Sequence, residues 1–279
     1  MTVRTMDFAG TFSTARRPVR RSKVRLWLGK QYLTLRRYIV WLFGGIQFAH
    51  VSDAAPHHTV FRHATPLLRQ LRKQDMGLQL GKIVNLRLAA ASIDGVTLFP
   101  GETFSYWRTI GPPTRRRGYR DGMILRSGTI AAGVGGGMCQ MSNLIYWMTL
   151  HTPLTVVERH RHGYDVFPDS NRTQPFGSGA TCFYNYGDLM VRNDTDDIWQ
   201  LRVSLTDTEL VGRWLCDRPA DCRYEVYEES GFIQAEPWGM YTRHNILRRR
   251  KLDPDGNVTD DEYVTENHAF MMYAPLLEG

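Results

Sequence analysis

The chain has 279 residues, of which 42% are hydrophobic, 11% aromatic and 23% charged, as is typical of a folded protein with one large core or two modest ones. Its net charge of +7 is concentrated at one end, because residues 1 to 38 hold ten Lys or Arg and one acid, a balance of +9 that leaves −2 for the rest. A nucleic-acid reader usually carries its basic residues on the folded domain, so this distribution argues against nucleic-acid binding. Four cysteines in a chain of this length do not make a disulfide scaffold.

The first 80 residues divide into an arm and a region with helical pattern. Residues 1 to 25 are predicted to be a flexible basic arm, and residues 26 to 80 a helical N-terminal region. Within that region, Asp53 to Pro66 reads as a polar connection. Its histidines, at positions 57, 58 and 63, have no acidic or cysteine ligand close by, so we interpret them as surface loop residues rather than metal ligands.

The N-terminal segment also bears on localisation. No secretory signal starts at the terminus, and the apolar run from Tyr38 to Ala49 is too short to span a bilayer, which needs about 20 apolar residues. We therefore predict a cytoplasmic protein. Peripheral contact of the basic N-terminus with a membrane, and secretion, stay open as alternatives.

The middle and the end of the chain predict an α+β protein, with a helix-containing N-terminal half followed by an antiparallel β-rich half. A helix is expected over residues 83 to 91, and two strands, 123 to 126 and 129 to 132, lead to three consecutive glycines. Beyond Pro153 the pattern is strand-rich. In a β-rich extension from 216 to 279, Asp255-Gly256 predicts a long hairpin.

Residues 133 to 146 predict a nucleophile at the start of a buried helix. Gly135, Gly136 and Gly137 allow close backbone approach, and the apolar residues that follow recur at three and four residues, which indicates a helix. Cys139 then lies in the first turn, where the helix dipole and unpaired amides favour a thiolate. The alternative is a buried cysteine that only fills space.

Several motifs in the same order resemble the VanW domain family, over roughly residues 83 to 206. Those that carry the resemblance are Gly-Gly-Gly-Met-Cys-Gln-Met-Ser (135–142), Glu-Arg-His-Arg-His (158–162), Asn-Leu-Arg-Leu-Ala-Ala (85–90), Pro-Gly-Glu-Thr-Phe-Ser (100–105), Gly-Tyr-Arg-Asp-Gly (118–122) and Asp-Leu-Met-Val-Arg-Asn (188–193). His-Thr-Pro-Leu-Thr (151–155) is further similar to stand-alone members from glycopeptide-resistance clusters. The resemblance implies peptidoglycan chemistry, since some multidomain members are regarded as L,D-transpeptidases that use the cysteine of this motif. We accordingly treat residues 81 to 215 as a VanW-like domain.

The resemblance also implies a base for the thiol. The family's histidine falls four residues after the glutamate, which is His162 here, and His160 is the second candidate. Where members commonly have Gly-x-Asp-Ala-Thr, this chain has Gly179 in place of the Asp. Its role could pass to Glu158, Asp165 or Asp169, and the sequence does not choose among them.

The remaining candidates surround the cysteine. Amides of the glycine run and of Cys139 or Gln140 are expected to hold an oxyanion, and the side chains of residues on the same helix face are expected to border a pocket. The substrate-binding candidates are Gly135, Gly136, Gly137, Gln140, Ser142, Asn143, Tyr146 and Arg159. We predict no cofactor and no metal, because the spacing of Cys139, His160 and His162 matches no zinc motif.

Two functional hypotheses follow. In the first, the protein is a cysteine-dependent acyl-transferase or peptidase that acts on the peptide part of peptidoglycan or its precursor, with Cys139 as nucleophile and His162 as base. In the second, it is a non-catalytic accessory that binds a cell-wall precursor or a resistance enzyme, as the missing Asp would suit. The sequence says nothing of its oligomeric state.

Overall fold

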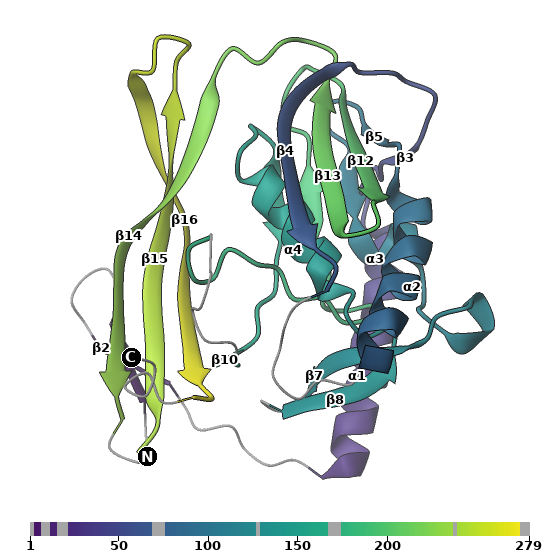
Figure 1. The fold of residues 1–279 in the computed structure, drawn as a ribbon, viewed down its shortest axis with the longest axis vertical. Helices are drawn as coiled ribbons and strands as arrows, with labels where there is room; N and C mark the ends of the chain where they lie inside the picture. The colour runs from purple at the N-terminus through teal and green to yellow at the C-terminus, as the bar shows by residue number, and fades with distance from the viewer. Residues whose placement is uncertain are drawn as a thin grey trace.

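The computed structural model describes residues 3–6, 12–15, 22–68, 76–126, 129–166, 174–236 and 239–273. It confirms an α+β fold in which helices are concentrated in the N-terminal half and antiparallel strands follow (Figure 1). The helices are α1 (Lys23–Phe43), α2 (Met76–Ile93), α3 (Tyr106–Ile110) and α4 (Cys139–Thr149), with a 3₁₀ turn at Arg115–Arg117.

A five-stranded antiparallel sheet forms one side of the core, in the order β3-β5-β12-β13-β4. In β12 the residues Trp199, Leu201 and Val203 alternate and are all buried, as a strand facing a core requires. The strands of this sheet are β3 (His50–Val51), β4 (His58–Pro66), β5 (Val96–Leu98), β12 (Trp199–Leu205) and β13 (Glu209–Cys216).

Helices α2 and α4 pack against this sheet, α2 against β12 and α4 against β13 and β4. In α4 the expected stripe of apolar residues is confirmed, because Met141, Leu144, Ile145 and Met148 are fully buried. Gly212 lets α4 approach β13 closely, since a Cβ there would lie 2.5 Å from the terminal methyl of Met148. The helix carrying Cys139 is therefore anchored deep in the core.

Two smaller sheets complete the part of the fold around Cys139. The hairpin of β7 (Asp121–Arg126) and β8 (Thr129–Val134) leads the chain into the glycine run, as predicted. A three-stranded antiparallel sheet, in the order β6-β11-β9, lies on the path that follows α4. Its strands are β6 (Thr103–Ser105), β9 (Thr155–Glu158) and β11 (Met190–Arg192).

The C-terminal residues form a separate layer of long strands on the left of Figure 1. The predicted hairpin at Asp255-Gly256 is confirmed, since β15 and β16 pair antiparallel on either side of it and Gly256 has a φ of 87°. The strands are β14 (Arg223–Ala235), β15 (Tyr241–Leu252) and β16 (Val258–Met271), and the short β10 (Tyr164–Asp165) runs parallel to β16.

The N-terminal region differs from the expectation. Residues 26 to 80 are not helical throughout. The prediction of a polar connection from Asp53 to Pro66 was wrong from His58 onward, because β4 is an edge strand paired along its length with β13. His63 lies in that strand, with its ring beside Trp147 and its Nε2 2.8 Å from Gln174 Nε2, so it is not a loop residue. Its histidines and terminal proline do not favour a strand locally, but pairing with β13 outweighs that local preference. Within the predicted arm, β1 (Val3–Met6) and β2 (Phe12–Ala15) pair with each other.

Candidate functional site

Cys139 is the first residue of α4 and is partly exposed as a residue, although its thiol is buried like the helix behind it. Met138 precedes it as a helix cap that contributes no side-chain hydrogen bond. In the first turn, the amides of residues 140 to 142 donate to the carbonyls of Gly137 and Met138, so the Cys139 amide is the one that has no hydrogen-bond partner among the described residues. This is the position that the sequence predicted for the thiol.

The sulfur of Cys139 is surrounded by hydrogen-bond donors. Cys182 supplies two of them, because its Sγ lies 3.7 Å and its backbone nitrogen 3.5 Å from Cys139 Sγ. A hydrogen bond from the Cys182 thiol, another from His162 and the Cys182 amide together hold the pKa of Cys139 well below that of a free thiol, although burial opposes them. Burial and the same sulfur–sulfur contact raise the pKa of Cys182 well above its usual range. The contact thus favours the thiolate form at Cys139 and the thiol form at Cys182.

The segment that carries Cys182 is fastened to α4 by two polar side chains. Ser142, fully buried, donates to the carbonyl of Ala180 at 2.6 Å, and Asn143 Oδ1 accepts from the Ala180 amide at 2.8 Å. Both residues lie one turn beyond Cys139 on the helix. They were predicted to bind substrate, and the structure shows them fixing the position of the second thiol.

The two candidate histidines have different neighbours. His162 is the one whose hydrogen bond and charge reach Cys139. His160 instead places its Nε2 2.9 Å from Glu158 Oε1, and the same carboxylate pairs with Arg37 of α1 and accepts from the Asp188 amide. His160 is therefore held by a carboxylate, which leaves His162 as the candidate base for the thiol.

The glycine run builds the site by backbone packing. A Cβ on Gly136 would lie 2.1 Å from the carbonyl carbon of Gly122, and one on Gly137 would lie 2.1 Å from the side chain of Lys82. The amides of Gly135, Gly136 and Gly137 donate to the carbonyls of Arg120, Gly133 and Met123. The expectation that they hold an oxyanion was therefore wrong, because a donor already paired in the backbone is not free to bind one.

Three further candidates point away from the thiol. The side-chain amide of Gln140 donates to Thr65 Oγ1 and to the Pro66 carbonyl, and its backbone amide to the Gly137 carbonyl. Tyr146 is buried, and the guanidinium of Arg159 lies over its ring at 4.8 Å. Arg159 also donates to the carbonyls of Gly177 and Gly179 and to two side chains of β16, so it ties the Gly177 loop to the C-terminal sheet.

Gly179, where the family commonly has Asp, is closely packed. A Cβ at this position would lie 2.7 Å from Asn143 Oδ1, the atom that receives the Ala180 amide. Of the proposed substitutes for that Asp, Glu158 contacts the other histidine, Asp165 accepts from Tyr273 in the C-terminal layer, and Asp169 lies outside the described residues. Glu158 is thus engaged by His160 and Arg37, and Asp165 by Tyr273 and Arg243.

Sequence reasoning missed three residues that shape the site. Cys182 was counted only as one of four cysteines, although it is the nearest partner of the thiol. Tyr106, fully buried, donates its hydroxyl to the Met138 carbonyl at 2.9 Å and so supports the helix start from below. Asn85 binds both the Arg120 backbone and the Gly136 carbonyl. Asn85 and Tyr106 lie in or next to the motifs quoted above, which could have drawn attention to them. Their hydrogen-bond partners are distant in the sequence, however, so no local pattern predicts these contacts.

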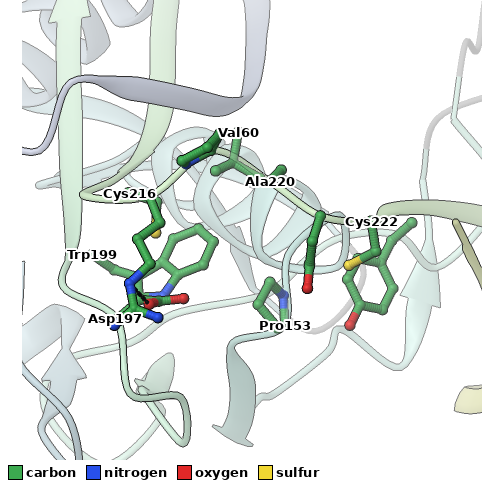
Figure 2. Close-up of a pocket in the computed structure, with 11 residues that line it drawn as sticks. Val60, Pro153, Asp197, Trp199, Cys216, Ala220 and Cys222 are labelled. Atoms are coloured by element: carbon green, nitrogen blue, oxygen red, sulfur yellow. Dashed lines mark ion pairs between the residues drawn. The ribbon is translucent and has the colours of Figure 1, made fainter. Parts of the chain in front are cut away.

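A cavity of about 270 Å³ lies elsewhere, between Pro153, Trp199 and Tyr224 (Figure 2). Cys216 and Cys222 stand on opposite sides of it in Figure 2, and all four cysteines are free. Its lining includes neither Cys139 nor His162, so it is not part of the thiol site. Across the residues that the structure describes, no three His, Cys, Asp or Glu side chains are grouped to hold a metal.

Comparison with known proteins places this site in a family. The family model described as VanW like protein matches residues 81–215. The chain is similar to the "Vancomycin B-type resistance protein VanW" of Enterococcus faecalis (strain ATCC 700802 / V583), with 36% identity over 205 residues that cover 74% of each chain. It is also similar to the "Uncharacterized protein YoaR" of Bacillus subtilis (strain 168), with 38% identity over 109 residues, 39% of this chain and 34% of that protein. No solved structure matches significantly. The chain therefore belongs to the VanW family.

Proposed function

We propose that this VanW protein is a cysteine-dependent acyl-transferase or peptidase that acts on the peptide part of peptidoglycan or of its precursor. The observation that carries the proposal is the environment of Cys139, a partly exposed residue at a helix start whose sulfur receives hydrogen bonds from Cys182 and His162. Such surroundings favour the thiolate, which is the reactive form of a cysteine nucleophile. The link to the cell wall rests on the family and on the relative named for vancomycin resistance.

In the proposed reaction, the Cys139 sulfur attacks a peptide carbonyl carbon to form a tetrahedral oxyanion. The C–N bond then breaks, His162 gives its proton to the leaving amine, and a thioester on Cys139 remains. An acceptor amine or water next attacks the thioester, His162 takes up its proton, and the thiolate leaves. With the glycine amides paired, the oxyanion donor that we assign is the Cys139 amide, which has no hydrogen-bond partner among the described residues.

Intact-protein mass spectrometry after incubation with muropeptides or a nucleotide-linked precursor tests this function. We expect a mass increase that equals the acyl part of the peptide and maps to Cys139, most abundant when no acceptor amine is added. The increase should be absent from Cys139→Ala and retained in Cys222→Ser, a control at a partly exposed thiol whose pKa is raised by burial. Turnover of the peptide by Cys139→Ala would refute the proposal.

A second candidate function is supported by Gly179, which stands where the family commonly has an Asp that could orient the histidine. Without an orienting group a histidine is a poorer base, and the protein would then act as an accessory that binds a cell-wall precursor or a resistance enzyme. Binding of the same muropeptides by calorimetry distinguishes the two. An accessory should bind them equally well as wild type and as Cys139→Ala, and never form the covalent adduct.

A further inference from the structure

Helix α1 docks on the protein by one face only. Arg37 pairs with Glu158 and donates to the Tyr186 carbonyl, the Tyr38 and Tyr184 hydroxyls are 2.7 Å apart, and Trp41 is buried. These residues all belong to the second half of the helix. The first half extends past β7 and β8 at the lower edge of the molecule, where the purple ribbon ends (Figure 1).

An apolar stripe runs along α1 on a different face from the docking residues, and its side chains are exposed. Its residues follow one another at intervals of one, three or four, and each has a relative exposure between 50% and 80%. At about 100° per residue they fill an arc of roughly 100°, centred roughly 130° from the docking face. The stripe consists of Val24, Leu28, Tyr32, Leu35, Ile39, Leu42 and Phe43.

Positive charge accompanies this stripe. Lys23, Arg25, Lys30 and Arg36 are exposed on α1, and the helix contains no Asp or Glu. Arg25 and Arg36 lie at the border of the apolar arc, at roughly 200° and 220° when Lys23 is set to zero. An exposed apolar stripe with arginines at its edge and no acid is complementary to an anionic lipid surface, which offers acyl chains beneath phosphate groups.

Crossing the membrane does not fit this helix. No helix in the described ranges is both long and apolar enough for a bilayer span. A helix of 21 residues is about 31 Å long, and lying flat it can place its whole stripe at the acyl boundary while its second half stays docked on the protein.

We propose that α1 is a membrane-docking helix, which lies in the interface of an anionic membrane with this apolar stripe (Val24 to Phe43) in the acyl boundary. The inference does not depend on the proposed acyl transfer. It concerns the same region of the molecule, however, because the docking face of α1 rests on Tyr184 and Tyr186, which follow Cys182 closely in the chain.

Flotation of the full chain with vesicles tests the proposal. Vesicles of phosphatidylcholine with about one third phosphatidylglycerol should bind it, and neutral phosphatidylcholine vesicles much less. The triple variant Leu28→Gln, Leu35→Gln, Ile39→Gln should lose binding to below detection, since each change should weaken it by about tenfold or more. Arg25→Gln with Arg36→Gln should weaken binding about fivefold per charge and flatten its decrease with added salt.

The matched control is Phe232→Gln with Ile233→Gln, two apolar residues of β14 with exposures of 43% and 46%. This variant should bind as the wild type does, although it loses the stacking of Phe232 on His244. The α1 variants should keep the wild-type melting temperature, because none of their changed side chains is buried. Binding that survives the triple change would overturn the proposal. So would a wild type that is dimeric without vesicles and becomes monomeric in the triple variant, since the stripe would then be covered by a second copy.

Discussion

Helices α4 and α1 carry apolar residues at the same helical spacing and differ in what covers them. The stripe of α4 is buried against the five-stranded sheet, whereas that of α1 faces away from the protein. Their charges differ in the same way, since α4 contains no charged residue and α1 contains five basic ones. A helical period therefore shows that a stripe needs a cover, and the charges beside it indicate whether protein or lipid supplies that cover.

The most severe way to test the tight packing around α4 is to add a side chain in the glycine run. Gly136→Val should destabilise the protein by about 4 kcal/mol or more, because its Cβ would overlap the backbone of Gly122, which cannot rotate away. Gly231→Val should cost about 1 kcal/mol or less, since its Cβ meets only the end of the Glu228 side chain. Urea unfolding of both variants checks this, and equal losses would contradict it.

The buried region should also show a pH dependence that the exposed helix lacks. Burial raises the pKa of Asp188 to about 7, from an ordinary value of 3.8, despite hydrogen bonds from Ser105 and two backbone amides. The folded state then binds more protons between these values, so the free energy of unfolding should fall by up to about 4 kcal/mol as the pH rises from about 4 to about 7.

Asp188→Asn is the matched variant for this effect. Its Oδ1 can still accept from the amides of Trp107 and Leu189, and its NH₂ can donate to Ser105. Urea unfolding at several pH values should show a flatter profile than the wild type. A wild-type profile that rises through this interval, and is unchanged in Asp188→Asn, would contradict the prediction.

The comparison of the two helices is most direct with one leucine from each stripe. Leu144 is 1% exposed, and its change to Ala should lower the free energy of unfolding by about 2 to 5 kcal/mol, through lost burial and the cavity left behind. Leu35 is 61% exposed, and its change to Ala should alter the free energy of unfolding by less than about 0.5 kcal/mol. Thermal unfolding without lipid measures both, and a large loss for Leu35→Ala would show that the stripe of α1 already packs on protein.

The smallest expected effect concerns the thiol pair. Cys182→Ala should raise the pKa of Cys139 toward that of a free thiol, because the largest stabilising contact of the thiolate is lost, and Cys182→Ser should raise it less. The rate of iodoacetamide alkylation at Cys139 against pH measures the change, with Cys222 as an internal reference. We expect a loss of about tenfold in rate near pH 7, and an unchanged profile would mean that Cys182 does not stabilise the thiolate.

Much of the fold could be predicted because it is encoded locally. The apolar spacing in α4, the β-branched run of β9 and the Asp255-Gly256 turn each indicate the local structure that the fold contains. β4 could not be predicted, because its histidines and terminal proline mask a strand that exists by pairing with β13, some 150 residues away.

The candidate site divides in the same way. Cys139 at a helix start could be predicted from neighbouring residues, and the choice of His162 came from the resemblance. The partner thiol of Cys182, the support of Tyr106 and the paired amides of the glycines arise from contacts between distant segments. The sequence pattern of one segment does not show which of its hydrogen-bond donors are already paired with another segment.

The carboxylate of Glu158 has a consequence for how relatives of this protein should vary. It accepts from Arg37 of α1, contacts His160 two residues further along and receives the amide of Asp188. Two of these partners are side chains, the permanently charged guanidinium of Arg37 and a ring nitrogen of His160. A carboxylate can accept a hydrogen bond from both at once. In an alignment of relatives that keep α1, positions 37, 158 and 160 should therefore change as a group, and a sequence that loses the arginine should also replace the glutamate or the histidine.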